Sequence, residues 1–480
     1  MEALGNYVGG EWTEARTGKL FNVLNPATGT IVAKAQMSGV QDVREAINLA
    51  AELRDKDEWG NDPRKRSFAL LNLADAMEEV KERLSKQLTI ENGKPLSLAR
   101  AEIGSSIDHV RFYAGLSRAV YGRTMGVEPT SFSIIAREPM GVVGHIVPWN
   151  YPVLLMFRAL AASLAAGNVC VVKPASYTPV TTALIMRLVD RINEFPKGVL
   201  NYVTGPGPVV GAEIARNPKV DMVTMTGDNK TGKEILRLAS QGVKKVALEL
   251  GGKSPNIVFP DADPKRAIEG ALSGAFTVSG QVCFAGSRIL VQRQVHDDFM
   301  KSFESAARSM KVGNGLDPAT QLGPIISRTQ MERIMEFIDI GREEAVLVTG
   351  GKQLTTARLA KGNFVEPTIF DEVPNDSKLA REEIFGPIAS VMEFTDEDDA
   401  VAMANDSKFG LAAAVWTNDV KRALRVSRKI RAGTIWVNAY GKTYAETEYG
   451  GYKQSGIGRE RGLDGLFEFT RSKHIYFDLT

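Results

Sequence analysis

The 480-residue chain is too long for a single compact core, so its length predicts two or three domains. Hydrophobic residues make up 44% of the chain and charged residues 24%, the balance of an ordinary globular protein. Because 59 lysines and arginines nearly balance 57 aspartates and glutamates, the composition shows no basic excess that would predict a nucleic-acid partner.

The first third of the chain has a mainly helical pattern. Residues 64–90 place apolar side chains at helical spacing and charges of both signs on the outer face. The pattern breaks at 118–137, where 130–136 predicts one strand of a projecting hairpin. The segment 473–479, at the other end of the chain, predicts a further extended stretch.

Short β-branched runs then alternate with helical patterns, which predicts βαβ units and a parallel sheet. A second alternating series follows Ser254, so two α/β blocks are expected, with a seam near Gly251 and Gly252. The first block has expected strands at 141–147, 169–172, 200–203, 222–224 and 246–248, with helices at 153–166 and 181–194. The second has expected strands near 287–291, 388–394, 413–416 and 434–437.

Cysteine usage and hydropathy predict a cytoplasmic protein. Cys170 and Cys283 are too few for a disulfide-stabilised secreted chain, so we expect free thiols, and residues 1–5 carry no signal-peptide pattern. The longest apolar stretch, 152–172, is interrupted by Arg158, whereas a membrane span needs about 20 nearly uninterrupted apolar residues. No membrane partner is expected.

Cys283 is the candidate nucleophile. It follows Ser279, Gly280 and Gln281, which are poor interior helix formers and predict a loop or helix end. A lone cysteine is usually a small buried hydrophobe, and Cys170, flanked by valines in an expected strand, keeps that interpretation.

Two further residues have a chemical and a structural interpretation each. Glu249 stands at an expected strand end before two glycines, where it is either a general base with a raised pKa or a structural partner for a lysine. Asn150, in the segment 148–152 between a strand and a helix, either caps that helix or directs its amide at a developing oxyanion.

Ends of expected strands carry candidate phosphate-binding and ribose-binding residues. Lys173 and Ser176 follow one strand, and 226–232 follows another and opens a helix, where a pyrophosphate can bind. The glycines at 205–211 have the wrong spacing for a dinucleotide fingerprint. The four histidines show no metal-ligand spacing, and no G-x-S-x-G elbow of a hydrolase occurs.

Taken together, these motifs resemble the aldehyde dehydrogenase superfamily over nearly the whole chain. Seven short motifs occur in the family's order: 25–29, 148–152, 173–175, 248–255, 280–283, 382–387 and 450–456. The resemblance implies an α/β fold with two Rossmann-like, doubly wound domains and a small β element for oligomerisation. It implies an NAD(P)-binding domain at 1–118 and 138–250, a catalytic domain at 251–445, and an oligomerisation element at 119–137 and 446–480.

The resemblance also implies the chemistry of an aldehyde oxidised to a carboxylic acid with NADP or NAD. Cys283 resembles the nucleophile that forms a thiohemiacetal and then a thioester, Asn150 the oxyanion donor and Glu249 the base that activates water. Lys173 resembles a further catalytic residue of the family. Lys173 and Glu383 also resemble the groups that hold the ribose hydroxyls.

The implied cofactor residues are Ile146, Pro148, Trp149, Lys173, Ser176, Gly205, Thr226, Gly227, Asp228, Thr231, Leu250, Gly251, Glu383 and Phe385. The implied substrate residues are Tyr151, Leu155, Arg158, Phe276, Val282 and Tyr449. Family members are commonly dimers or tetramers, so a homodimer or homotetramer is expected.

Three positions depart from the pattern of many relatives. Ser176 replaces a glutamate that would repel a 2′-phosphate, so NADP is expected to be accepted and preferred. Asp228 replaces a serine near the pyrophosphate, where it caps the helix but adds negative charge. Arg158 either pairs with a carboxylate or recognises a polar or anionic group on the substrate.

The substrate stays open among small aliphatic aldehydes, hydroxyaldehydes and semialdehydes. Two other functions are alternatives. A CoA-acylating relative shares the cysteine but generally lacks a glutamate like Glu249, and a catalytically silent structural relative would have no need of Cys283, Asn150 and Lys173.

Overall fold

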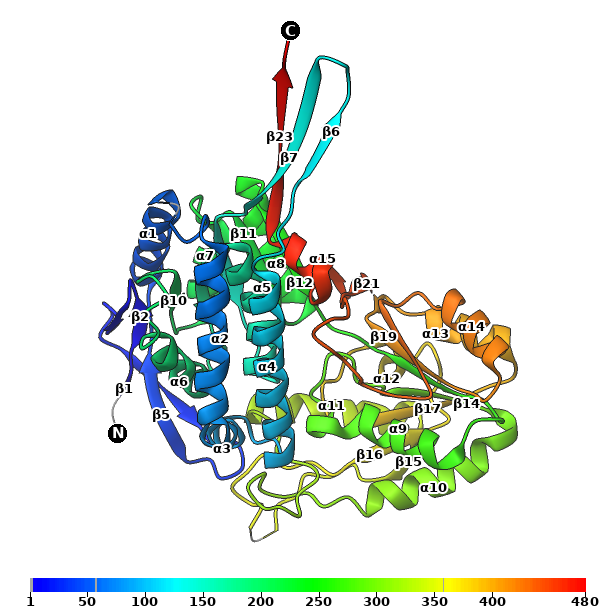
Figure 1. The fold of residues 1–480 in the computed structure, drawn as a ribbon. Coiled ribbons are helices and arrows are strands. Elements are labelled where there is room, and N and C mark those ends of the chain that lie inside the picture. Colours follow the sequence, from blue (N-terminus) through cyan, green and yellow to red (C-terminus); the bar gives the residue numbers. More distant parts are fainter. Residues whose placement is uncertain (1–2, 57, 357) are drawn as a thin grey trace.

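The computed structural model describes residues 3–56, 58–356 and 358–480 of the chain. Two large, mostly parallel sheets lie side by side, and a narrow three-stranded arm projects from the body (Figure 1). The first sheet is built mainly from the first 250 residues and the second from the strands that follow.

The first sheet has eight strands within these described ranges, in the order β22-β12-β11-β8-β9-β10-β2-β3. Its five central strands run parallel, as the alternating pattern predicts, and its edge strands are antiparallel. The bounds are β22 (Gly456–Ile457), β12 (Lys245–Glu249), β11 (Met222–Thr226), β8 (Val142–Ile146), β9 (Val169–Lys173), β10 (Leu200–Tyr202), β2 (Asn6–Val8) and β3 (Glu11–Thr13).

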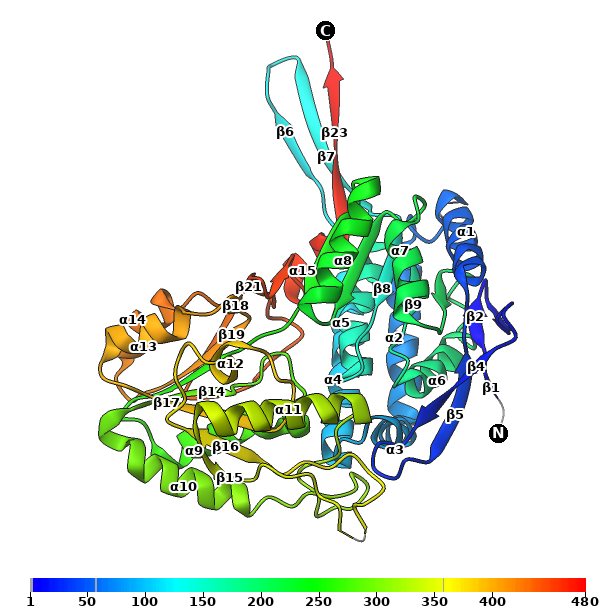
Figure 2. The ribbon, with the colours of Figure 1, turned by 180° about the vertical axis from the view of Figure 1, so that it is seen from behind.

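Helices cover both faces of this sheet. α5, an almost wholly buried helix, lies in front of it in Figure 1 with α2 and α4 outside, whereas α7 and α8 lie in front in the reverse view of Figure 2. The bounds are α1 (Val40–Lys56), α2 (Pro63–Glu79), α3 (Lys81–Asn92), α4 (Leu96–Leu116), α5 (Pro152–Ala166), α6 (Pro179–Val189), α7 (Ala212–Arg216) and α8 (Asn229–Ala239).

The second sheet has seven strands in the described part of the chain, in the order β15-β16-β17-β14-β13-β19-β20, all parallel except the edge strand β15. One apolar cluster joins this sheet to α9 and α10, and another joins it to α11, α13 and α14 on the opposite face. The strands are β13 (Pro255–Val258), β14 (Arg288–Gln292), β15 (Val346–Thr349), β16 (Thr368–Asp371), β17 (Ile388–Phe394), β19 (Ala412–Trp416) and β20 (Thr434–Val437). The helices are α9 (Pro264–Phe276), α10 (His296–Arg308), α11 (Arg328–Glu344), α12 (Lys378–Arg381), α13 (Glu397–Asn405) and α14 (Val420–Lys429).

The arm joins two segments that lie far apart in the sequence. β23 (Thr470–Asp478) pairs antiparallel with β7 (Ser131–Pro139), and β7 pairs with β6 (Arg123–Gly126). The predicted hairpin strand and the predicted C-terminal extended segment are therefore confirmed as neighbours. Smaller elements are β1 (Ala3–Leu4), β4 (Leu20–Leu24), β5 (Ile31–Gln36), β18 (Phe409–Gly410), β21 (Tyr452–Lys453) and α15 (Gly462–Glu468).

Some predicted boundaries differ from the structure. The helical stretch 64–90 is two helices, because the backbone at Val80 leaves the helical region between α2 and α3. The helix predicted at 181–194 ends at Val189. The segment 446–480 is divided, because β22 joins the first sheet and α15 packs on α5, so that only β23 lies in the arm. None of the described helices is both long and apolar enough to cross a membrane.

Candidate active site

The loop before Cys283 is held in an unusual backbone conformation. Val278 and Ser279 have φ values of 51° and 55°, a left-handed region that costs non-glycine residues energy and is often found at functional sites. Gly280 follows with φ 70°, and a Cβ atom there would lie 2.0 Å from the carbonyl oxygen of Gly386. The prediction of a loop or helix end is confirmed, and the close approach of Gly386 requires a glycine at position 280.

The thiol of Cys283 is partly exposed and lies 3.9 Å from the hydroxyl of Tyr449. Burial raises the pKa of this thiol to about 11, although the nearby Arg158 acts in the opposite direction. The thiol is therefore protonated at neutral pH, and a base must take its proton before the sulfur attacks a carbonyl carbon.

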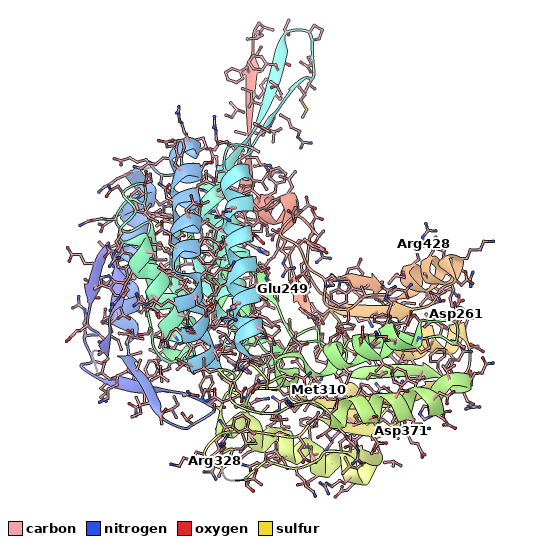
Figure 3. The ribbon with its side chains drawn as sticks, turned by 60° about the horizontal axis from the view of Figure 1, so that its bottom comes forward. Glu249, Asp261, Met310, Arg328, Asp371 and Arg428 are labelled. Atoms are coloured by element: carbon pink, nitrogen blue, oxygen red, sulfur yellow. The ribbon has the colours of Figure 1, made fainter. Side chains whose placement is uncertain are left out.

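Glu249 ends β12 and is 4% exposed, at the centre of the molecule between the two α/β parts (Figure 3). Neither carboxylate oxygen has a hydrogen-bond partner among the described residues. Burial raises the pKa of Glu249 to about 8, with Arg158 opposing that rise and Glu460 adding to it. No lysine pairs with it within these residues, so the general-base interpretation fits the geometry better than the structural one.

Asn150 does not cap α5. Its Nδ2 atom donates to the carbonyl oxygen of Gln281 at 3.1 Å, which ties it to the loop of the nucleophile. An amide nitrogen has two hydrogens, so a second donor is left for an oxyanion. The start of α5 is capped instead by Glu102, whose carboxylate accepts from the backbone N–H groups of Val153 and Leu154.

A buried ion pair supports the segment that carries Asn150 and Tyr151. Lys94 and Glu102 are fully buried and bonded to each other, and Lys94 Nζ also donates to the backbone oxygen of Asn150 at 2.6 Å. The same ammonium lies 3.9 Å from the ring centre of Tyr151. Lys94 therefore fixes the backbone of Asn150, and Glu102 fixes the start of α5.

A cavity of about 530 Å³ extends from Cys283 along the carboxyl ends of β9 and β11. Ligands bind at such strand ends in open α/β sheets. It is lined by Val147, Pro148, Trp149, Asn150, Lys173, Ala175, Ser176, Tyr177, Gly207, Met225, Thr226, Gly227, Asp228, Thr231, Gly251, Cys283, Gln330, Arg333, Glu383 and Phe385. We call it the cofactor cavity, because most of its lining was predicted to bind the pyridine nucleotide.

The polar groups of this cavity fit such a cofactor. Burial lowers the pKa of Lys173 to about 8 and raises that of Glu383 to about 7, so an ammonium and a carboxyl group face a common space. Asp228 caps α8 by accepting from the N–H of Thr231 at 2.9 Å, as predicted. Phe385 meets Trp149 edge to face at 5.3 Å between ring centres.

Three predicted cofactor residues lie outside this lining. Ile146 packs beside Gly211, and Leu250 packs against Gly232 of α8. Gly205 faces Ser38, and only its carbonyl oxygen reaches the site, accepting from Ser176 Oγ at 3.3 Å. Gly207, two positions further along the chain, lines the cavity.

Two lining residues on α11 were missed. Gln330 donates to the backbone oxygen of Phe385 at 3.1 Å, and Arg333 donates to that of Glu383 at 3.0 Å. They hold the segment 383–385 over the cavity from the second α/β part. No local pattern singles them out, because their role depends on where α11 docks.

A second, smaller cavity of about 210 Å³ also reaches Cys283. We call it the aldehyde cavity, because several of its lining residues were predicted to bind the substrate. The predicted substrate residues Tyr151, Leu155, Arg158 and Val282 line it. Its whole lining is Leu98, Ala101, Glu102, Ser105, Asn150, Tyr151, Leu154, Leu155, Arg158, Val282, Cys283, Phe284, Gly441, Thr443 and Arg461.

Two other predicted substrate residues differ. Tyr449 contacts the thiol of Cys283 but is not part of the cavity lining. Phe276 is fully buried in the apolar core, where it stacks on Phe303 with ring centres 6.1 Å apart, so the prediction that it lines the substrate tunnel is wrong. It ends α9 on the face that packs against the second sheet.

Arg158 is engaged by the protein itself. Its Nε atom forms an ion pair with Glu460, and its Nη2 atom donates to the hydroxyl of Thr226 at 3.1 Å. The side chain is 1% exposed. Of its two interpretations, pairing with a carboxylate is the one observed.

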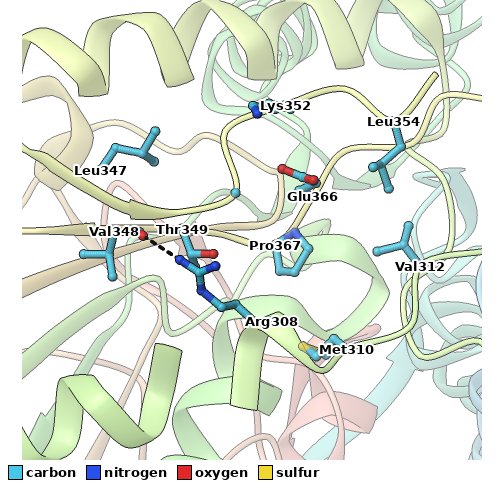
Figure 4. A pocket seen from close by; sticks show the side chains of 11 residues that line it. Arg308, Met310, Val312, Leu347, Val348, Thr349, Lys352, Leu354, Glu366 and Pro367 are labelled. Atoms are coloured by element: carbon cyan, nitrogen blue, oxygen red, sulfur yellow. Dashed lines mark hydrogen bonds between the residues drawn. The ribbon is translucent and has the colours of Figure 1, made fainter. Parts of the chain in front are cut away.

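A separate hollow of about 640 Å³ lies beside β15 and the end of α10 (Figure 4). Its lining includes Arg308, Met310, Lys352 and Glu366, but none of the residues predicted for chemistry. Arg308 is paired with Glu304 at 2.7 Å. The candidate active site is therefore the one around Cys283.

Comparison with known proteins identifies the family of this chain. The model of the aldehyde dehydrogenase family matches residues 12–475. A betaine aldehyde dehydrogenase of Bacillus subtilis is 41% identical over 98% of this chain and 96% of its own. A hydroxyisobutyraldehyde dehydrogenase of Mycolicibacterium austroafricanum is 40% identical over 98% of this chain and 93% of its own.

Solved structures agree as well. A betaine aldehyde dehydrogenase of Staphylococcus aureus in complex with NAD⁺ has a TM-score of 0.98 and 37% identity, covering 100% of this chain and 95% of that one. Another structure of that enzyme contains a cysteine modified by BME, again with a TM-score of 0.98 and 37% identity, covering 100% of this chain and 96% of that one. The chain therefore belongs to the aldehyde dehydrogenase family and carries out cysteine-based oxidation of an aldehyde to a carboxylic acid.

Proposed function

We propose that Cys283 is the nucleophile, Asn150 the oxyanion donor and Glu249 the base. One observation carries this assignment: the cofactor cavity and the aldehyde cavity both include Asn150 and Cys283 in their linings. A thiol at the junction of two cavities can meet an aldehyde from one side and a hydride acceptor from the other. Glu249, buried and without a bonding partner in the described chain, lies close enough to act electrostatically on Cys283.

The chain's own groups supply the remaining steps. Glu249 accepts the thiol proton, the Cys283 sulfur bonds to the aldehyde carbon, and Asn150 Nδ2 with the backbone N–H of Cys283 holds the oxyanion. The pyridine nucleotide, when bound, supplies the hydride acceptor. Loss of hydride from the thiohemiacetal carbon to that acceptor leaves a thioester, and Glu249 releases its first proton to solvent. Glu249 then takes a proton from a water molecule that attacks the thioester, the carbon–sulfur bond breaks, and the acid leaves as the Cys283 sulfur regains a proton.

We infer that NADP is accepted and preferred over NAD. Ser176 lines the cofactor cavity beside Lys173 and Tyr177, so no carboxylate stands at this position to repel a 2′-phosphate. Lys173, Glu383 and Phe385 would hold the ribose and nicotinamide parts. Asp228 adds negative charge at the pyrophosphate end, and nothing in the structure explains that substitution.

The aldehyde cavity supports a small substrate. Its volume of about 210 Å³ lies below the roughly 300–1,000 Å³ of sites for drug-sized ligands. Small aliphatic aldehydes, hydroxyaldehydes and semialdehydes are the candidate classes, and the name of one relative, a hydroxyisobutyraldehyde dehydrogenase, is of the second class.

We further propose a cytoplasmic homo-oligomer, dimer or tetramer, with an NAD(P)-binding domain, a catalytic domain and the arm as its three parts. The arm exposes the strand edges of β6 and β23, and Tyr476 and Phe477 are 52% and 39% exposed. Unpaired strand edges are natural sites for pairing between subunits. Light scattering after size exclusion tests this proposal, and a monomer for the wild type would contradict it.

A panel of small aldehydes with NAD and with NADP tests the activity itself. We expect aldehyde-dependent formation of NAD(P)H and a free acid without CoA, with a higher kcat/KM for NADP. A product that forms only with CoA would support the acylating alternative, whereas no turnover with any aldehyde would support a silent relative. A strong NAD preference would contradict the cofactor proposal alone.

A further inference from the structure

Arg461, at the wall of the aldehyde cavity, is a buried cation that forms no ion pair with a carboxylate of the described residues. It is 3% exposed, yet its Nε and Nη1 atoms form no hydrogen bond with any described residue. Its φ of 65° lies in the left-handed region, which an arginine adopts only where its surroundings enforce it. Arg461 thus combines a buried charge with a strained backbone conformation, and both raise the free energy of the folded chain. It lies in the lining of the cavity that reaches Cys283.

The other charges around the cavity are already matched. Arg158 pairs with Glu460, and Lys94 pairs with Glu102. Arg461 lies over the ring face of Tyr449, with its guanidinium carbon 5.0 Å from the ring centre, and the carboxyl groups of Glu460 and Glu249 act on it at longer range.

Two further titratable groups, Glu249 and Arg461, contribute to the charge around the cavity. Burial raises the pKa of Glu249 to about 8, so that residue is largely neutral at pH 7. Burial lowers the pKa of Arg461 to about 10, so its guanidinium stays charged. Arg461 therefore presents a positive charge at the wall of the cavity.

An unpaired buried guanidinium is unfavourable until an acceptor reaches it. A carboxylate matches its fork of N–H donors better than a hydroxyl does, since both oxygens can accept at once. A quaternary ammonium group, in contrast, would place like charge beside Arg461. The geometry therefore favours one charge class of substrate.

We propose that Arg461 determines specificity by binding a carboxylate at the far end of the aldehyde, so that the preferred substrates are short aldehyde acids. This inference rests on the proposed role of Cys283, because the anchored substrate must present its aldehyde carbon to that sulfur. Arg158, held by Glu460, supports the positive potential without being the direct partner.

Three aldehydes of similar size and different charge test the proposal: succinic semialdehyde, butyraldehyde and betaine aldehyde. We expect wild-type kcat/KM to fall in that order at constant ionic strength. Arg461→Met should lower kcat/KM for succinic semialdehyde by roughly thirtyfold or more, mainly through KM, with a much smaller loss for butyraldehyde. Arg461→Lys, which keeps the charge but not the fork, should lie between the two.

Arg428→Met provides the matched control, since Arg428 is an exposed arginine on α14 at the outer edge of the molecule (Figure 3). It should leave all three rates as in the wild type. Equal losses for all three aldehydes in Arg461→Met, with a lower melting temperature, would show a structural role and overturn the proposal. So would a wild type that prefers butyraldehyde or betaine aldehyde.

Succinate gives a readout that does not need turnover. Calorimetry should show succinate binding to the wild type and weaker binding to Arg461→Met. If no aldehyde is oxidised, the proposed function fails, but this binding difference still decides the role of Arg461. If aldehydes are oxidised and succinate binds both proteins equally, only the inference about Arg461 fails.

Discussion

The two cavities that meet at Cys283 are built from different kinds of structure. The cofactor cavity follows the carboxyl ends of adjacent parallel strands, so most of its lining comes from short segments at the ends of β8, β9, β11 and β12. The aldehyde cavity is lined by side chains from helices and loops that are remote in sequence, including Glu102 on α4 and Arg461 before α15.

The two cavities also differ in the interactions that stabilise their walls. Backbone positions at strand ends are fixed by the sheet's hydrogen bonds, so the cofactor cavity needs few buried charges to keep its shape. The aldehyde cavity depends on buried ion pairs, whose members are costly to leave alone. Substitutions on the aldehyde side should therefore affect stability and chemistry together, whereas those on the cofactor side should affect binding.

The largest effect is expected at the junction of the cavities. Cys283→Ser should reduce aldehyde-dependent NAD(P)H formation by roughly 10³-fold or more, since a serine hydroxyl is a far weaker nucleophile here. Cofactor binding, followed by NADPH fluorescence, should be kept. Cys170→Ala is the control and should retain turnover, because Cys170 lies buried within β9. Loss of turnover in the control instead would contradict the assignment.

Glu249→Gln should slow the steady-state rate by about 10²–10⁴-fold. In the wild type, kcat should rise as the pH is raised through about 8, because the base acts in its deprotonated form and burial raises its pKa to that value. The variant should lose this dependence. An initial burst of NAD(P)H in stopped-flow measurements would place the block at thioester hydrolysis, and an unchanged pH profile would exclude Glu249 as the base.

Lys94→Met tests whether the aldehyde side depends on its buried pair. Leaving Glu102 charged and alone should lower the free energy of unfolding by about 3–5 kcal/mol, measured by denaturant titration. The double variant Lys94→Met/Glu102→Gln should recover part of that loss, since the stranded charge is removed. Lys86→Met, which breaks an exposed pair with Glu82, should cost about 0.5 kcal/mol at most. A similar cost for Lys86→Met and Lys94→Met would remove the contrast between the two regions.

Ser176→Glu should give the smallest change and sharpen the description of the cofactor side. A carboxylate beside the 2′-phosphate would shift the ratio of kcat/KM for NADP over NAD by roughly tenfold or more toward NAD. Stability should change little, because Ser176 is only partly buried. Ser176→Ala separates charge from the loss of the hydroxyl and should keep the wild-type order of cofactors. A ratio unaffected by Ser176→Glu would show that this position does not face the adenosine ribose.

The sequence by itself determined the two α/β blocks, the five central strands of the first sheet, the strands β14, β17, β19 and β20 of the second, and two extended segments of the arm. It also singled out Cys283, Glu249, Asn150, Lys173 and Ser176 as candidate site residues. These features are local: periodicity, glycines and strand ends are read within a few residues of one another. For the same reason most of the cofactor cavity could be predicted, while its α11 residues could not.

Only the tertiary structure decided which residues the buried charged and aromatic side chains contact. It paired Arg158 with Glu460 and placed Phe276 in the core against Phe303. It also left Nε and Nη1 of Arg461 without a hydrogen bond among the described residues, in the cavity that reaches Cys283. The partners of Arg158 and Phe276 lie far from them in the sequence, and burial and pairing depend on distances that only the packed chain fixes. The free energy of a buried charge follows from those distances, so the specificity of the aldehyde cavity is a property of the fold rather than of any one motif.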